Sequence, residues 1–187
     1  MEVQRKSLTQ LFVPICFETL FYMLAGMVDT LMLSSVSDQA VGAVGTANTY
    51  IGVFIIMFGV ISSGMVAVMT QNIGAGKPGI AYQARQLGLL FNAIIGVLMS
   101  VFLAFFSGNI LKIVSIAPAL LEPAETYLKI VGGACFLNAL IPIFSSYLRV
   151  FGYTKQSLFA SVVGNVINFV LNAVFLYVMN LGVMGVA

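Results

Sequence analysis

The stretch "TYIGVFIIMFGVISSGMVAVMT", residues 49–70, contains no charged side chain, and the uncharged run around it extends from Gln39 to Gly76. About 20 apolar residues are enough to cross the hydrocarbon core of a bilayer. Lipid cannot satisfy irregular backbone, so only helices or a closed barrel can span it. A barrel strand would alternate apolar and polar residues, whereas this stretch is apolar on all sides. It therefore predicts a transmembrane helix.

The composition of the whole chain supports the same interpretation. Hydrophobic residues make up 60% of the sequence and charged residues only 7%, against about 25% charged residues in soluble domains. A second long uncharged segment runs from Gln156 to Ala187. These features indicate an integral membrane protein that contacts the lipid bilayer along most of its length.

The hydrophobic segments predict an all-α, multi-pass helical bundle formed by residues 1–187. A further hydrophobic segment begins at Leu181, and turn chemistry such as "SSVSDQ", "GAGKPG", "APALLEP" and "FGYTKQ" separates the segments. Small residues of the second span, Gly52, Gly59 and Gly64, are expected to allow close helix packing. The five expected spans are residues 10–35, 44–70, 86–110, 123–149 and 156–179.

Basic residues are distributed unequally between the two ends of the expected helices. Cytoplasmic loops of membrane proteins are enriched in lysine and arginine, so the excess predicts a cytoplasmic amino terminus in the cell membrane. One side is expected to carry Arg5, Lys6, Lys77, Arg85, Arg149 and Lys155, and the other Lys112 and Lys129.

Several chemistries are excluded by the residues themselves. The chain has no histidine, which removes Ser-His hydrolysis and His-ligated zinc or haem. The segment "GAGKP" lacks the first glycine and the Ser or Thr of a phosphate-binding loop, since Gln71 and Pro78 occupy those positions. We therefore expect no enzyme, no cofactor and no nucleic-acid partner.

Two carboxylates fall inside the first span. A charged side chain at mid-membrane is costly, so such residues usually face a bundle interior and mark an ion or substrate path. Glu18 and Asp29 are separated by about three helical turns and share nearly one face, with Tyr22 between them. Glu18 and Tyr22 are candidates for lining a cavity, and Asp29 is the candidate for ion coupling.

Pro14 lies one turn before Glu18. A proline inside a helix removes one backbone hydrogen bond and can bend the helix, whereas a proline near the helix start is tolerated. Both interpretations remain open for Pro14.

The fifth span carries three asparagines on one helical face: Asn165, Asn168 and Asn172. Carboxamide oxygens suit cation coordination, and the amide NH2 groups can donate to a carboxylate. The alternative is that the stripe only links helices. We expect it to face Asp29, so that Asp29, Asn168 and Asn172 form a site for Na+ or H+, with Asn165 on the cavity wall and no other metal site.

Several motifs, in their order along the chain, resemble those of the multidrug and toxic compound extrusion (MATE) family. The motifs are Pro14, Glu18, "VDT" at 28–30, "SGMVAVMTQNIGAGK" at 63–77, "YLKI" at 127–130, "LRVFGYTK" at 148–155 and "NFVLNAVFLY" at 168–177.

The resemblance implies a twelve-helix secondary antiporter of two bundles, which exports drugs or other small organic cations in exchange for Na+ or H+. It makes Asp29 the coupling carboxylate of the first helix, Pro14 its bend, and Asn168 and Asn172 a polar pair of the fifth helix. Some relatives have aspartate where this chain has Asn172, which leaves the ion open. It also implies that the chain is the first lobe, lacking the carboxy-terminal lobe, and does not transport alone.

Two alternatives remain open. A lipid or oligosaccharide flippase of the same architecture would be expected to place basic residues in its cavity, whereas acids and amides occupy these spans. A non-transporting membrane assembly subunit would also account for five spans.

Overall fold

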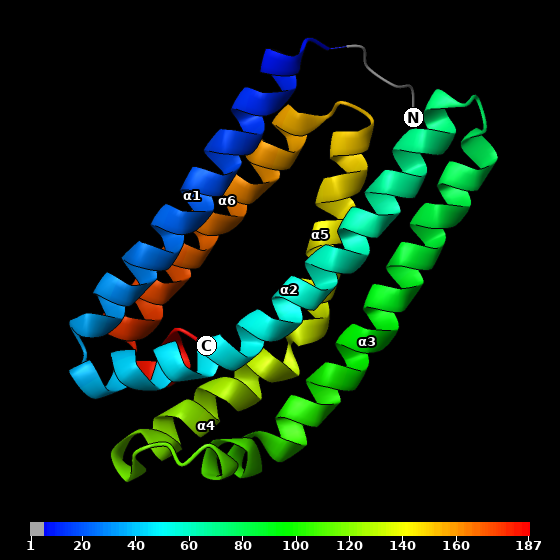
Figure 1. Ribbon diagram of the computed structural model, residues 1–187. Helices are drawn as coiled ribbons and strands as arrows, with labels where there is room; N and C mark the ends of the chain where they lie inside the picture. Colours follow the sequence, from blue (N-terminus) through cyan, green and yellow to red (C-terminus); the bar gives the residue numbers. More distant parts are fainter. Residues whose placement is uncertain (1–5) are drawn as a thin grey trace.

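The computed structural model describes residues 6–187, and every regular element within them is helical (Figure 1). Arg5, one of the basic residues expected at the cytoplasmic side, lies outside the described residues. The elements are α1 (Leu8–Ser34), α2 (Asp38–Gly74), α3 (Pro78–Ile113), α4 (Pro118–Gly133), α5 (Cys135–Val150), α6 (Thr154–Ala173), the π-helix η1 (Val174–Val178) and the 3-10 helix η2 (Gly182–Gly185).

Four helical segments are long and apolar enough to cross a membrane: α1, α2, α3 and α6 together with η1. The pair α4 and α5 meets the same criterion as one broken span, bent by 47°. The predicted five-span bundle is therefore confirmed when this pair counts as one crossing.

The span expected over residues 123–149 is formed by two helices, because the chain breaks at Ala134. Gly132 and Gly133 weaken the helix before the break. Gly132 also packs so tightly that a Cβ there would lie 2.8 Å from the Cβ of Leu103. The Oγ of Ser100 on α3 accepts a hydrogen bond of 2.8 Å from the backbone N–H of Phe136, just beyond the break. The bend is thus held by α3.

Several segments expected as turns are helical. Ser37 caps α2 by accepting a hydrogen bond from the N–H of Ala40, so the helix begins at Asp38 rather than near residue 44. Most of the "APALLEP" segment is likewise helical, because Pro118 suits the first turn of α4. After Leu181 the described chain forms the 3-10 helix η2.

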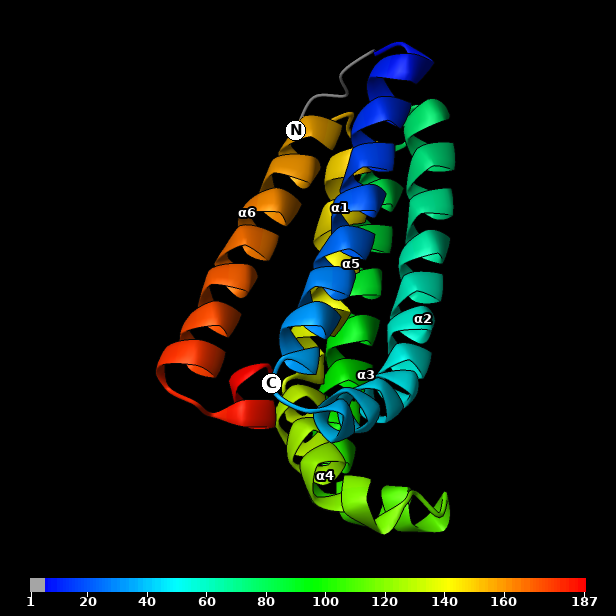
Figure 2. The same ribbon diagram turned by 90° about the vertical axis from the view of Figure 1, so that its left-hand side faces the viewer.

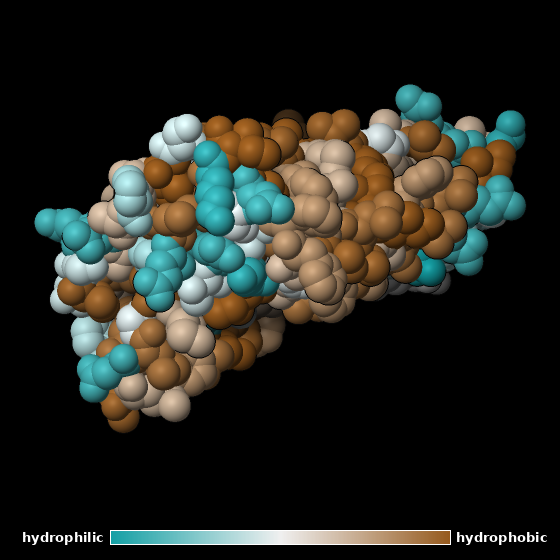
Figure 3. All heavy atoms as spheres, turned by 90° about the horizontal axis from the view of Figure 1, so that it is seen from below, coloured by the Kyte–Doolittle hydropathy of each residue, from teal (hydrophilic) through white to brown (hydrophobic). Residues whose placement is uncertain are grey.

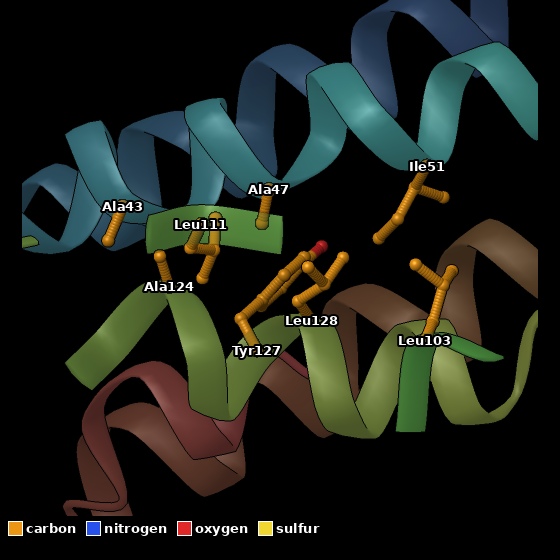
Figure 4. Packing of buried hydrophobic residues seen from close by; sticks show 8 residues of the cluster. All are labelled: Ala43, Ala47, Ile51, Leu103, Leu111, Ala124, Tyr127 and Leu128. Atoms are coloured by element: carbon orange, nitrogen blue, oxygen red, sulfur yellow. The ribbon is translucent and has the colours of Figure 1, made fainter. Parts of the chain in front are cut away.

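Helices α2, α3, α4 and α5 pack against one another, whereas α1 and α6 lie side by side beside this group (Figures 1 and 2). Ala43 and Ala47 of α2 meet Ala124 and Tyr127 of α4 in the largest cluster (Figure 4). Small side chains there let the two backbones approach closely. The pair α1–α6 is joined to the rest mainly through its connections to α2 and α5.

Close packing at glycine occurs on a different helix from the one expected. A Cβ at Gly52, Gly59 or Gly64 of α2 would meet nothing within 4 Å. On α3, by contrast, a Cβ at Gly96 would lie 2.7 Å from the Cβ of Ala139. The three glycines of α2 therefore do not make the approach expected of them.

Hydrophobic residues cover broad areas of the surface, with hydrophilic residues gathered in patches (Figure 3). The described basic residues of the majority side lie at one end of the bundle, where α1, α3 and α6 begin and α2 and α5 end (Figure 1). These residues are Lys6, Lys77, Arg85, Arg149 and Lys155. That this end faces the cytoplasm stays a prediction.

Candidate functional site

The candidate site lies where the carboxyl-terminal half of α1 meets the last turn of α6. The Nδ2 of Asn172 donates a hydrogen bond of 2.9 Å to Oδ1 of Asp29. Asn172 is buried, with 5% of its surface exposed, and Asp29 is partly buried. The two helices lie side by side along their length, so the contact follows from their pairing (Figure 1).

Asn168 extends this contact by one helical turn. The same Nδ2 of Asn172 also donates to Oδ1 of Asn168 over 3.2 Å. Residues four apart on a helix face the same side, so Asn168 lies next to Asn172 on α6. Asn168 is itself exposed, and its described hydrogen bond is to Asn172 rather than to α1. The structure therefore brings together Asp29, Asn168 and Asn172, the three residues expected to form the cation site.

Asn165 belongs to the same stripe but does not join these hydrogen bonds. Its Nδ2 is buried and has no hydrogen-bond partner within residues 6–187. It is half-buried, one turn from Asn168 toward the start of α6. Asn165 thus lies beside the site rather than in it.

The three side chains offer oxygen ligands and one formal negative charge. Hard cations such as Na+ take carboxylate and carbonyl oxygens. Across the described part of the chain, no group of three or more His, Cys, Asp or Glu side chains could hold a metal ion. A ligand set here would combine the Asp29 carboxylate with amide oxygens.

Asn172 can serve Asp29 in two ways. As observed, its NH2 group satisfies one carboxylate oxygen. Turned by half a rotation about its last bond, the amide would present its oxygen toward the carboxylate, which is favourable only if a cation lies between them. The same residue can therefore stabilise both the empty and the occupied site.

Glu18, expected on the cavity wall, is instead enclosed by three helices. Its Oε1 lies 2.8 Å from an Nη of Arg149 on α5. Ser157 on α6 donates its hydroxyl to the carboxylate, at 3.1 Å and 3.2 Å from the two oxygens. Only 8% of Glu18 is exposed. This carboxylate is neutralised within the bundle.

Arg149 and Ser157 were not identified as site residues from the sequence. The positive bias placed Arg149 at the same end of the bundle as the start of α1, which was the one available signal. Lys6 supports the same junction, since its Nζ donates a 2.7 Å hydrogen bond to the carbonyl of Gly152.

The remaining candidates of the first helix behave differently. Pro14 is buried, and α1 runs through it without a break. The bend at Pro14 stays a prediction. Tyr22 is 65% exposed and contacts neither carboxylate through a hydrogen bond within the described residues.

Two further polar contacts lie at the same end as Asp29. The hydroxyls of Ser35 and Tyr177 are 2.9 Å apart, which joins the end of α1 to η1. Tyr127 of α4 donates to Oδ1 of Asn48 on α2 over 3.1 Å. Both pairs join residues far apart in the sequence, and no motif indicated them.

Comparison with known proteins identifies a family to which the sequence is similar. The family profile MatE matches residues 14–174. The chain is 35% identical over 185 residues to the uncharacterized transporter YisQ of Bacillus subtilis, covering 97% of this chain and 41% of that protein. It is 28% identical over 179 residues to the multidrug resistance protein PmpM of Pseudomonas aeruginosa, covering 95% of this chain and 37% of that protein.

The fold is also shared with solved structures. A MOP superfamily transporter from Pyrococcus furiosus superposes with a TM-score of 0.87 at 21% identity, over 95% of this chain and 39% of that one. The chain thus spans about two fifths of the length of the proteins it matches.

Proposed function

Because the chain belongs to the MatE family, whose members are transporters and not enzymes, we propose that it forms one bundle of a secondary antiporter. This antiporter exports small organic cations in exchange for Na+ or H+. The chain is a multi-pass membrane protein by its spanning helices. Its amino terminus faces the cytoplasm in this proposal, on the side that carries most of its basic residues.

The observation that carries the proposal is the hydrogen bond from Asn172 to Asp29, together with the one from Asn172 to Asn168. A carboxylate within a spanning helix is costly, and such residues usually mark an ion or substrate path. Here the NH2 group of Asn172 donates to it, and the neutral amides of Asn172 and Asn168 leave its charge uncompensated. A monovalent cation or a proton would supply the missing charge.

Transport also needs a second element that moves against this bundle. Carriers built from structural repeats place substrate and ion sites between the repeats and expose them alternately to the two sides. The chain spans 41% of its Bacillus subtilis relative. We propose that a second bundle of comparable size completes the carrier.

The charges near the site favour a cationic substrate. Asp29 has no basic partner within 4 Å among the described residues, whereas Arg149 is already paired with Glu18. A flippase for anionic lipid-linked substrates would need basic groups that remain available. The multidrug resistance name of the Pseudomonas aeruginosa relative supports the export of drugs.

The ion site can be tested on this chain without measuring transport. Binding to the folded state raises thermal stability in proportion to the logarithm of ligand concentration. In a Cys16→Ser background, which removes the partly exposed second thiol, the buried Cys135 provides a readout, because a thiol-reactive fluorophore reports its exposure on unfolding. We expect NaCl, compared with choline chloride at equal ionic strength, or a lower pH, to raise the melting temperature.

Asp29→Asn should remove that ion-dependent shift. Asp38→Asn is the matched control, since Asp38 is an exposed aspartate at the start of α2. If Asp29→Asn keeps the full shift, or Asp38→Asn loses it, the cation is bound elsewhere and the proposed coupling site is wrong.

A further inference from the structure

A groove of about 470 Å³ runs between the first turns of α1 and α6, away from the Asp29 site. Val13, Pro14 and Phe17 of α1 form one wall, and Leu158 and Phe159 of α6 form the other. Lys155 is the one charged side chain among the lining residues. The volume is within the range of small-molecule sites, about 300–1,000 Å³.

The groove has a cationic end and apolar walls, which match the anionic headgroup and the acyl chain of a phospholipid. Lys155 lies in the first turn of α6, at the end of the bundle where most described basic residues gather. The apolar walls continue from there toward the middle of the membrane, for instance along Leu158 and Phe159, one turn further. A cationic mouth above an apolar channel suits an anionic headgroup above an acyl chain.

The charge at the mouth is not neutralised by the protein. Lys155 is exposed and forms no salt bridge within residues 6–187. Glu18, one turn beyond Pro14, is already paired with Arg149. From this complementarity we propose that the α1–α6 groove binds one anionic phospholipid, with Lys155 selecting the headgroup. This site is separate from the proposed cation site and does not depend on transport.

The protein contains a natural comparison for this groove. A second groove of about 310 Å³ lies between α2 and α3, lined by residues such as Val68, Leu87 and Phe91, with no charged side chain among its lining residues. It lies in the halves of α2 and α3 nearest the same end of the bundle. A general attraction of anionic lipid to that end of the bundle should enrich such lipid in both grooves. A site at Lys155 should enrich it only in the α1–α6 groove.

The chain has no tryptophan, so one introduced tryptophan reports lipid contact through quenching by brominated acyl chains. Phe159→Trp places the reporter in the α1–α6 groove, and Phe91→Trp places it in the α2–α3 groove. Both phenylalanines are exposed, at 71% and 55%. Each variant of the full chain is reconstituted in vesicles of brominated and unbrominated phosphatidylglycerol and phosphatidylcholine, identical in both leaflets.

In the Phe159→Trp chain, we expect phosphatidylglycerol to compete about five-fold better than phosphatidylcholine for contact with the tryptophan, as measured by bromine quenching. In the Phe91→Trp chain, the preference for phosphatidylglycerol should be distinctly smaller. Lys155→Gln combined with Phe159→Trp should bring this preference down to the value at the second groove. Lys77→Gln, which removes an exposed lysine from the same end, should leave it unchanged.

Four results would overturn the proposal. Equal preference in the two grooves, or an equal loss with Lys77→Gln, would show only general attraction to a basic surface. A preference that survives Lys155→Gln would assign the headgroup to other residues. Absence of quenching in the Phe159→Trp chain by either lipid would show that protein, from a second bundle or a second copy, covers the groove; Phe17→Trp on the opposite wall repeats this measurement.

Discussion

Asn172 donates a hydrogen bond to Asp29 across 143 residues of sequence, from the last turn of α6 to the far half of α1. Both residues lie within spanning segments, where water is scarce and an unsatisfied polar group is costly. The contact therefore stabilises the α1–α6 pair and, in the proposed carrier, positions the carboxylate for its ion.

Asn172→Leu should destabilise the bundle more than Asn168→Leu does. The first change leaves Asp29 without its donor, and a hydrogen bond to a charged group is worth about 1.5–3 kcal/mol. The second removes a contact between two neutral amides, worth about 0.6 kcal/mol in membranes. Unfolding free energies in mixed micelles of both variants measure the difference. Equal losses would mean that Asp29 does not depend on Asn172.

The pair Glu18–Arg149 should behave as an energetically coupled pair. Glu18 is buried, whereas the Arg149 side chain is 34% exposed. The cost of breaking the pair should therefore fall between surface and buried values, at about 1–3 kcal/mol.

A double-mutant cycle with Glu18→Gln and Arg149→Met tests this coupling. The double variant should be more stable than the sum of the single changes implies, because neither charge is then left alone. Additive losses would show that the two side chains contribute independently.

The spanning helices and the contact between Asp29 and Asn172 could be predicted from local features of the sequence. Long uncharged runs indicate spans, and asparagines at helical spacing share a face with or without a known partner. The break at Ala134 could not be predicted, since residues on both sides continue one apolar segment and the capping hydroxyl comes from Ser100 on another helix.

The partner of Glu18 could not be predicted from the sequence either. Its carboxylate indicated an interior position, and burial confirms this part of the interpretation. Which base would neutralise it depends on how α5 and α6 turn back beside α1, a long-range property without a local motif. The same applies to Gly96, whose neighbour Ala139 is contributed by another helix.

Gly96→Ala should destabilise the protein, whereas Gly59→Ala should not. A Cβ at Gly96 would lie 2.7 Å from the Cβ of Ala139 and 3.0 Å from the Cα of Phe136, so backbone must shift. Such overpacking costs about 1–3 kcal/mol. At Gly59 nothing lies within 4 Å, and alanine is the better helix former by about 1 kcal/mol. Melting temperatures of both variants decide the matter, and a tolerated Gly96→Ala would contradict the packing.

Pro14→Ala should slow amide hydrogen exchange in the first half of α1. Proline has no N–H, so the carbonyl one turn earlier, at Gln10, lacks its helical donor. Alanine restores that bond and removes the weak point at which the helix could bend. Pro118→Ala is the control, because Pro118 is at the first position of α4, where no bond is added. Unchanged exchange around Gln10 and Glu18 would argue against a hinge at Pro14.

In the complete carrier, Asp29→Asn should abolish export driven by an ion gradient and leave membrane insertion intact. The substitution keeps the size of the side chain and its Oδ1 acceptor, but it removes the charge that a Na+ or a proton would neutralise. Proteoliposomes that contain a fluorescent organic cation, with a Na+ gradient or a pH gradient imposed separately, identify the coupling ion by which gradient drives transport. Asp38→Asn should retain transport under the same gradient, because Asp38 is exposed at the start of α2. Retained gradient-driven export by Asp29→Asn would remove Asp29 from the coupling mechanism, whatever its contact with Asn172 contributes to the fold.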